Sequence, residues 1–349
     1  MHETKKGYNE TVSSSSSTLV QIKKLQIQYT VRTGLFRKTP LYAVNDVTLN
    51  IPQGETTALV GESGSGKTTL GKATLRLLDP VAGTLLFDGK DITKTSQSKL
   101  KPFRRRAQEI FQDPYASINP SMTIFQSIEE PLLIHDVGDS SERRRLVYEA
   151  LNDVRLTPPD LIGSSYPHSL SGGQRQRVSI ARSIVLRPDY IVADEAISMV
   201  DASSRMEIIN LLKNLQHIHG ITFLYITHDI ATAQHFADKI AVMYMGKIVE
   251  LGTPKQIVQN PLHPYTQGLI AAIPEPDPNN RFHERPVVTG DPPDPLSLPN
   301  GCLFNPRCLK KLGPTCEMAI PILEVTENNH AVACHLYPNA SPNDPNHIT

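Results

Sequence analysis

One segment, Gly61–Thr68, constrains the fold of this 349-residue chain more than any other. It reads GESGSGKT and matches the pattern G-x-x-x-x-G-K-[ST] at every position. An apolar run, Glu55–Glu62, precedes the loop, and a stretch typical of a helix, Lys67–Leu78, follows it. Its glycines let successive backbone N–H groups approach a phosphate at the start of a helix. The segment therefore predicts an α/β domain in which a strand–loop–helix unit binds a nucleoside triphosphate.

The residues of this loop have distinct expected roles. Lys67 can reach the β- and γ-phosphates of the nucleotide, and the Thr68 hydroxyl can ligate Mg²⁺. A glycine-rich turn that binds nothing is the alternative, which the strand before the loop and the helix after it disfavour. The motif alone does not separate kinases, GTPases, helicases and transport motors. The residues expected to line the nucleotide are Gly61, Glu62, Ser63, Gly64, Ser65, Gly66, Lys67, Thr68 and Thr69.

Apolar runs and helical stretches alternate from about residue 19 to about residue 255. Ile191–Ala193 and Ile221–Thr227 read as strands, and Lys239–Met245 with Lys247–Leu251 reads as a hairpin around Gly246. This alternation predicts a largely parallel sheet flanked by helices. Between about residues 122 and 168 no run reads as a strand, and the apolar spacing predicts a helical insertion.

A second glycine-containing segment follows this insertion. Leu170–Gln174 reads LSGGQ and leads into a helical stretch that is closed by Pro188. Ser171 is expected to cap the helix, and the two glycines expose backbone N–H groups at its start. Alone, such a turn is usually a plain loop. Because it is far from the first loop, it is suited to a nucleotide held on another subunit.

An acidic pair, Asp194 and Glu195, ends the apolar run that starts at Tyr190. A strand that delivers an acid is the arrangement that holds Mg²⁺, here through Asp194. Glu195 is then placed beside the γ-phosphate, where it can polarise an attacking water. The alternative is that both acids cap the next helix.

Together these motifs resemble the ATP-binding-cassette (ABC) family, in the family's own order and over about residues 19–260. The resemblance implies a P-loop NTPase cassette: a RecA-like α/β core, an antiparallel β subdomain and a helical subdomain at about residues 115–185. The matching elements are Gly61–Thr68 (Walker A), Gln112 (Q-loop), Leu170–Gln174 (signature), Asp194 and Glu195 (Walker B and catalytic acid), Asp201 (D-loop) and His228 (H-loop).

The resemblance also implies roles for single residues. Gln112 contacts Mg²⁺ and the attacking water, and His228 contacts the γ-phosphate, although a histidine at a strand end is more often structural. Tyr29 stacks on the adenine ring, with Phe36 as a competing candidate. Both Gln112 and His228 thus join Glu195 as expected catalytic residues.

By the same resemblance, each nucleotide lies between the Walker A loop of one subunit and the signature of the other. Ser171 and Gly173 then contact the γ-phosphate held by the opposite subunit, and Gly172, Gln174 and Asp201 are also expected at the nucleotide. Hydrolysis removes the bridging phosphate, the two subunits part, and the helical insertion transmits the motion to membrane subunits.

The segment after the catalytic acid departs from the family. Ala196 stands where the family generally has proline, and Met199 and Val200 replace a small residue and a leucine. Both acids and Asp201 remain, so hydrolysis is expected to survive. The changed segment can alter the interface between the subunits.

Composition limits the location and the partners. Lys+Arg and Asp+Glu are both 35, so the formal net charge is zero. The composition therefore lacks the excess of basic residues that is typical of proteins that bind nucleic acid. No run approaches the ~20 apolar residues that span a bilayer. Residues 1–18 read as a disordered polar leader rather than a signal peptide, and residues 339–349 as a polar tail. With the resemblance, this predicts a peripheral protein at the cytoplasmic face of the cell membrane.

Residues 261–338 differ from the cassette in composition, with many prolines, and are expected to form a small irregular C-terminal domain. At its start, Asn260–Thr266 reads NPLHPYT and resembles a segment of the oligopeptide/dipeptide importers. We interpret it as a proline-framed turn leading into a helix, Thr266–Ile273, and assign its His263 no chemistry. A plain domain junction is the alternative.

All four cysteines lie in this region, within 33 consecutive positions: Cys302, Cys308, Cys316 and Cys334. Structural disulfides are not expected in the cytoplasm, and a metal centre can staple a region too small for its own core. Four thiolates suit zinc or an iron–sulfur cluster. Some peptide-importer ATPases carry a [4Fe–4S] cluster, so the resemblance favours the cluster over zinc or no metal.

The implied function is that of an ATP-binding and ATP-hydrolysing subunit, with Mg²⁺, that powers binding-protein-dependent import of di- and oligopeptides. The implied partners are a second ABC ATPase subunit in a heterodimer, two integral-membrane permease subunits and, indirectly, an extracytoplasmic solute-binding protein. Import of oligosaccharides or nickel is the alternative. A soluble ABC ATPase acting on DNA or ribosomes, and an exporter subunit, are the rival classes.

Overall fold

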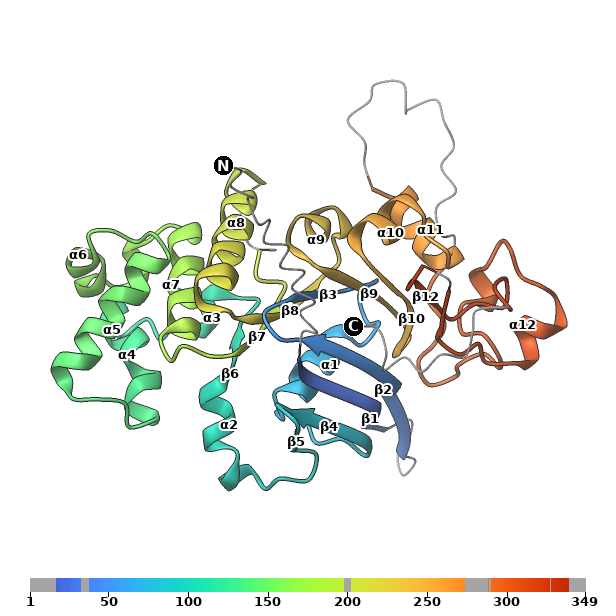
Figure 1. Ribbon diagram of the computed structural model, residues 1–349, viewed down its shortest axis with the longest axis horizontal. Helices are drawn as coiled ribbons and strands as arrows, with labels where there is room; N and C mark the ends of the chain where they lie inside the picture. Colours follow the sequence, from blue (N-terminus) through green and yellow to red (C-terminus); the bar gives the residue numbers. More distant parts are fainter. Residues whose placement is uncertain are drawn as a thin grey trace, which may run out of the picture.

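The computed structural model of the chain describes residues 17–32, 38–197, 202–273, 288, 290–326 and 328–338. An eight-stranded sheet runs through its centre (Figure 1). In order across the sheet, its strands are β11 (Glu324–Val325), β12 (Ala331–Val332), β10 (Lys247–Gly252), β9 (Lys239–Tyr244), β3 (Thr56–Val60), β8 (Thr222–Thr227), β7 (Tyr190–Asp194) and β6 (Ala107–Ile110).

The middle of this sheet is parallel, as predicted. β3 pairs with β8 and β9, and β7 pairs with β6 and β8, all in parallel. Every residue of β3, β7 and β8 is buried, which requires helices on both faces. α1 (Lys67–Thr74) covers one face, and α8 (Ala202–His219) and α9 (Ile230–Phe236) cover the other (Figure 1). The predicted hairpin is also present, as the antiparallel pair β9–β10.

A four-stranded antiparallel sheet lies against α1 and the N-terminal half of the core. Its strands, in the order β2–β1–β4–β5, are β2 (Lys38–Pro52), β1 (Thr18–Arg32), β4 (Ala82–Phe87) and β5 (Lys90–Asp91). Leu25 and Val47 of this sheet share one apolar cluster with Leu59 of β3 and Leu70 of α1. The antiparallel sheet therefore helps to fix the strand and the helix that flank the predicted phosphate loop.

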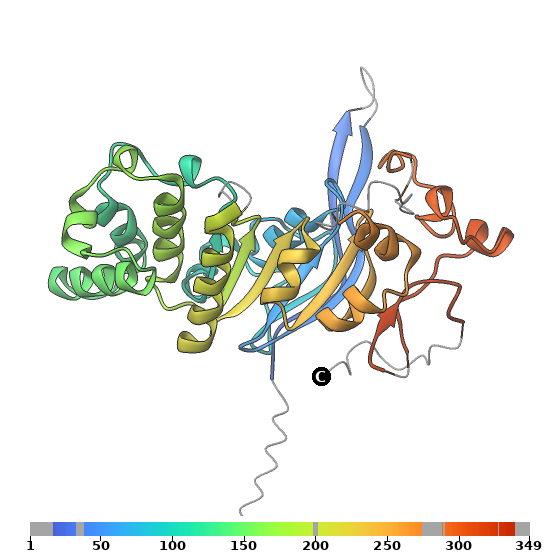
Figure 2. The same cartoon turned by 90° about the horizontal axis from the view of Figure 1, so that it is seen from above.

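The chain between β6 and β7 is helical, which confirms the predicted insertion. Its helices form a lobe at one end of the molecule (Figures 1 and 2). They are α3 (Pro114–Ser117), α4 (Ile124–Ile134), α5 (Ser140–Asp153), α6 (Pro159–Ser164) and α7 (Gly172–Ile184). α7 packs against β6, and α2 (Lys101–Arg106) precedes that strand, so the lobe is attached directly to the parallel sheet.

The C-terminal region joins the cassette instead of standing apart. β12 pairs antiparallel with β10 and β11 pairs with β12, which extends the large sheet at its edge. Cys302, Phe304 and Cys316 belong to the same apolar cluster as the parallel strands. The prediction of a separate small C-terminal domain is therefore not confirmed, because this region shares both the sheet and the core of the cassette. Among the described residues, no helix is long and apolar enough to cross a bilayer.

A fully buried carboxylate, that of Glu250 on β10, ties the C-terminal region to the sheet. It accepts hydrogen bonds from the backbone N–H groups of Leu262 (2.8 Å) and His263 (2.9 Å), and from His330 Nε2 (2.7 Å). A buried polar group is tolerated when hydrogen bonds satisfy it. The NPLHPYT segment is therefore held by a specific polar anchor.

His263 of this segment is the cap of α11 (Pro264–Ala271), and its Nδ1 accepts the Tyr265 N–H at 3.0 Å. Burial lowers the pKa of His263 to about 4, whereas in the unfolded chain it titrates near 6.5. Between these values only the unfolded chain takes up the proton. The stability that depends on neutral His263 is therefore complete above pH ~6.5 and is lost as the pH falls toward 4.

We expect wild-type protein to lose about 1.3 kcal/mol more unfolding free energy between pH 7.5 and 5.5 than His263→Asn does. Asparagine can also cap a helix but does not titrate. Urea unfolding of both proteins at the two pH values measures the difference. Equal losses in the two proteins would contradict a buried neutral histidine.

Candidate nucleotide-binding site

The predicted phosphate loop lies between β3 and α1, and its glycines are required by close packing. A Cβ at Gly61 would meet the Met243 carbonyl oxygen at 2.2 Å, and a Cβ at Gly66 would meet that of Ala43 at 2.1 Å. Gly66 also has a φ of 104°, which favours glycine. The loop is thus pressed between strands β2 and β9, with its backbone held in place for an anion.

Lys67 is folded back onto the loop. Its Nζ donates to the carbonyl oxygens of Gly61 and Glu62, each at 2.8 Å. Burial lowers the pKa of Lys67, and the nearby carboxylates of Glu195, Asp194 and Glu62 oppose this shift. The amine is therefore held by carbonyl groups of the phosphate loop itself, and a lysine of this loop is expected to bind phosphate oxygens.

The three residues predicted to surround Mg²⁺ line one cavity: Thr68, Gln112 and Asp194. Thr68 Oγ1 donates to Asp194 Oδ1 at 3.2 Å. Burial raises the pKa of Asp194, a shift that a bound cation reverses because it favours the carboxylate. Oxygen donors of this kind are the ligands that Mg²⁺ prefers, so the residues present fit the ion.

Glu195 stands at the point where Gln112 and His228 converge. Gln112 Nε2 donates to one carboxylate oxygen at 2.8 Å, and His228 Nδ1 lies 3.2 Å from the other. The backbone of Glu195 has a φ of 46°, a conformation that costs a non-glycine residue about 1 kcal/mol and is concentrated at functional sites. Its N–H donates to the Ile226 carbonyl at 2.9 Å, which holds this conformation. The three predicted catalytic residues therefore form one cluster.

Tyr29 lies near the end of β1 with its ring exposed, and its hydroxyl is 3.5 Å from Thr69 Oγ1 on α1. Tyr29 therefore lies beside the phosphate-loop helix, and its stacking on adenine stays a prediction. The competing Phe36, the D-loop Asp201, and Met199 with Val200 lie outside the described residues. Ala196 is buried, next to the predicted catalytic acid Glu195.

The signature segment begins α7. Ser171 is its cap, and a capping box is complete: Gln174 N donates to Ser171 Oγ at 3.3 Å and Ser171 N donates to Gln174 Oε1 at 2.9 Å. The predicted cap is thus confirmed. Gly172 and Gly173 occupy the first turn and are partly exposed; backbone N–H groups in a first turn have no partner within the helix. The lining of the cavity around Thr68 does not include the signature segment.

Two contacts to the phosphate loop were not anticipated from the sequence. The Arg307 guanidinium binds the Glu62 carboxylate through two hydrogen bonds, and Tyr265 Oη accepts the Glu62 N–H at 2.8 Å. Tyr265 belongs to the NPLHPYT segment, which marks a family without revealing a role. Nothing in the local sequence distinguishes Arg307 from a surface arginine.

The four cysteines are free thiols that lie within electrostatic range of one another. In the part of the chain that the structure describes, no three His, Cys, Asp or Glu side chains are grouped to hold a metal. The predicted cluster and its zinc alternative are therefore not supported by a formed ligand set. Burial raises the pKa of Cys302 and Cys308, and that of Cys334 to about 11, so these thiols carry protons at neutral pH.

The sequence matches two protein families. The family described as ABC transporter matches residues 44–198, and the family described as oligopeptide/dipeptide transporter, C-terminal region, matches residues 249–316. The first covers the phosphate loop, the signature and the acidic pair. The second covers Tyr265, Arg307 and three of the four cysteines.

Individual proteins are similar along most of their length. The oligopeptide transport ATP-binding protein AppF of Bacillus subtilis is 40% identical over 329 residues, 93% of this chain and 99% of AppF. A Brucella ovis protein, provisionally named for peptide import, is 44% identical over 298 residues, 85% of this chain and 93% of that protein. The ATP-binding cassette MJ0796, solved as a post-hydrolysis dimer with ADP and phosphate, is 30% identical with a TM-score of 0.61, over 68% of this chain and 99% of that one.

The similarity to AppF covers both the cassette and the C-terminal region. The ordered motifs and the cluster around Glu195 agree with the match of the cassette to the ABC transporter family. The chain belongs to the ABC transporter family, as an ATPase of its oligopeptide/dipeptide branch.

Proposed function

We propose that this chain is the ATP-hydrolysing subunit of an importer of di- and oligopeptides. The observation that carries the proposal is the Glu195 carboxylate, held between Gln112 and His228 directly after the Mg²⁺-type ligand Asp194. A carboxylate fixed in this way is suited to orienting and polarising a water molecule. The relatives named for peptide transport support the class of cargo.

One set of residues binds the phosphates, and another set handles the proton of the attacking water. Lys67 and the backbone N–H groups of Gly61–Thr68 hold the β- and γ-phosphates. Thr68 and Asp194 would hold Mg²⁺, which would supply charge neutralisation at these phosphates. Glu195 accepts the proton of the attacking water, while Gln112 and His228 hold its two oxygens in place. Catalysis by this site is positioning and electrostatics, without a covalent intermediate.

A second ATPase subunit is part of the proposal. The N-terminus of α7, capped by the exposed Ser171, lies outside the lining of the catalytic cavity, and a helix N-terminus is suited to binding an anion. Facing another cassette, it would complete the site around that partner's γ-phosphate. The partner is proposed to be a different ABC subunit, so that the motor is a heterodimer and the isolated chain turns over slowly.

A groove between the core and the helical lobe is the proposed contact with the membrane subunits. It is lined by residues of α2, β6, α4 and α7 and of the segments that follow α1 and β6, and it includes the exposed apolar side chains of Leu77, Phe111 and Ile134. Phe111 is adjacent to Gln112, so a segment bound here can sense the catalytic cluster. We place the chain at the cytoplasmic face of the membrane, below two permease subunits and an extracytoplasmic binding protein.

Uptake by cells that lack this chain tests the function and the cargo together. Cells are complemented with wild-type protein or with Glu195→Gln, and uptake of a labelled tripeptide, a labelled trisaccharide and nickel is measured. We expect only tripeptide uptake to fail without the chain and to return with the wild type alone. Loss of trisaccharide or nickel uptake instead would mean that this compound, and not the peptide, is the cargo. Normal uptake of all three compounds would contradict the proposal that the chain powers an importer.

We further propose that the four cysteines bind an iron–sulfur cluster. What favours it is the gathering of all four cysteines within 33 consecutive positions and the hydrogen bond that Cys316 Sγ accepts from the Leu312 backbone N–H at 3.4 Å. Hydrogen bonds to sulfur are typical of such centres. The thiols must lose their protons on binding, so the raised pKa values make the bare site an inert one.

Metal analysis of anaerobically purified protein separates the three possibilities. We expect brown protein with near-stoichiometric iron, and colourless iron-free protein from Cys302→Ser. Colourless wild-type protein that contains zinc would mean that the cysteines bind zinc instead of a cluster. Metal-free wild-type protein would contradict a metal centre.

A further inference from the structure

The phosphate loop is held from outside the cassette by an ion pair that spans the length of the chain. Arg307 Nη1 and Nη2 donate to the two oxygens of Glu62 at 2.8 and 3.0 Å. The Arg307 side chain is only 7% exposed, and that of Glu62 is 26% exposed. A bidentate pair with this burial is far stronger and more directional than a surface salt bridge.

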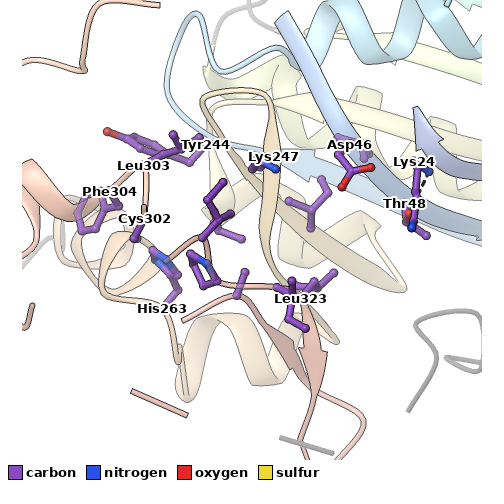
Figure 3. A pocket seen from close by; sticks show the side chains of 17 residues that line it. Lys24, Asp46, Thr48, Tyr244, Lys247, His263, Cys302, Leu303, Phe304 and Leu323 are labelled. Atoms are coloured by element: carbon purple, nitrogen blue, oxygen red, sulfur yellow. Dashed lines mark hydrogen bonds between the residues drawn. The ribbon is translucent and has the colours of Figure 1, made fainter. Parts of the chain in front are cut away.

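Arg307 is held in one place by aromatic rings. It ends the short helix η4 (Asn305–Arg307), and its guanidinium carbon lies 6.0 Å from the ring centres of both Tyr244 and Phe304. Those rings are in edge contact with each other, and Tyr265 packs against both. Figure 3 shows Tyr244 and Phe304 on the same side of the cavity between the sheet and the C-terminal region. The arginine is therefore preorganised for Glu62.

The negatively charged carboxylate of Glu62 lies in the loop that binds ATP, where it is expected to repel the phosphates. Its carboxylate is close enough to Lys67 Nζ to act on it electrostatically, and its own carbonyl oxygen binds that amine. ATP brings several negative charges to the same loop. A bare carboxylate there opposes binding, and a carboxylate neutralised by a fixed guanidinium does not.

We propose that Arg307, with Tyr265, is a positioning residue of the ATP site: it neutralises Glu62 and fixes the first turn of the phosphate loop. The C-terminal region is thereby part of the nucleotide-binding machinery and not only an appendage of the cassette. This inference rests on the proposed function only in that the loop binds ATP.

Substitutions at the two ends of the ion pair test this inference through ATP affinity. With the purified full-length chain and Mg²⁺, we expect Arg307→Ala to weaken ATP binding about tenfold, because it leaves Glu62 unpaired. Arg307→Lys keeps the charge but not the bidentate geometry, so its ATP affinity should fall about threefold. Glu62→Gln should bind ATP about threefold more tightly, since the positive charge of Arg307 is released toward the phosphates.

The double substitution separates electrostatic positioning from a structural role. Glu62→Gln in the Arg307→Ala protein should recover most of the lost affinity, because the uncompensated carboxylate is gone. In steady-state hydrolysis, Arg307→Ala should raise KM for ATP and leave kcat within twofold. Lys311→Ala is the matched control, because Lys311 lies in the same region and pairs with Glu317 on the surface.

Three results would overturn the inference: unchanged ATP affinity in Arg307→Ala, a double variant as weak as Arg307→Ala, or Glu62→Gln weaker than the wild type. The last of these does not depend on the folding of any Arg307 variant. A wild-type chain that fails to bind ATP would instead contradict the proposed function itself.

Discussion

A chain that carries Glu195→Gln is expected to bind ATP with wild-type affinity and to hydrolyse it at least ~100-fold more slowly. A general base contributes about 10²–10⁴ to the rate of a proton-transfer step, and an amide cannot take the proton from water. Glutamine keeps the size of the side chain and can still bond to Gln112, so the binding residues Lys67 and Thr68 remain in place. Isothermal titration with ATP and a phosphate-release assay measure the two effects on the same protein.

Glu317→Gln is the matched control, because it makes the same chemical change on an exposed side chain that pairs with Lys311. It should bind and hydrolyse ATP as the wild type does. Hydrolysis by Glu195→Gln at more than a tenth of the wild-type rate would transfer the role of base to another group. His228, 3.2 Å from the same carboxylate, is the first residue to substitute in that case.

The sequence was sufficient for the parts of this molecule that depend on local patterns. Glycine spacing, an apolar strand and the following helix predict a phosphate loop because each is a local requirement of anion binding. The cap at Ser171 follows from a serine three residues before a glutamine. The hairpin β9–β10 follows from two β-prone runs about one glycine.

What the sequence could not supply are contacts between distant segments. Arg307 reaches Glu62 across 245 positions, and β12 joins β10 because the fold brings the C-terminal region back to the sheet edge. The proline-rich composition indicated a region without its own core, which is correct. Packing then gave that region the core of the cassette, and no periodicity in the sequence marks this outcome.

Helix ends were the other weak point, for a reason that is visible in the caps. α11 begins at Pro264 and not at Thr266, because His263 caps it with a ring nitrogen, a group outside the preferred cap residues. α1 ends at Thr74 although the apolar residues continue to Leu78. There the chain turns toward β4, and Arg76, with a φ of 53°, leaves the helical conformation.

Gly173→Glu is expected to leave the fold and the ATP affinity of this chain intact and to abolish the pairing of two ATP-loaded subunits. Apart from its chain neighbours and the backbone of its own helix, no atom of the described residues lies within 4 Å of a Cβ built at Gly173. A glutamate in the first turn of a helix is favourable for the helix dipole. Loss of function in this variant is therefore not a loss of stability. Its carboxylate lies at the helix N-terminus where the γ-phosphate of the opposite subunit is proposed to bind.

The sharpest version of this experiment uses Glu195→Gln as the background, because ATP is not consumed there and the closed pair persists. With Mg²⁺ and ATP, size-exclusion chromatography of this chain co-purified with its partner ATPase subunit should show a heterodimer for Glu195→Gln and separate subunits for Glu195→Gln/Gly173→Glu. Ser140→Glu places the same charge in the first turn of α5, away from the signature, and should leave the dimer intact. A dimer that survives Gly173→Glu would mean that this helix end does not face a nucleotide, since like charges in a water-poor interface cost several kcal/mol.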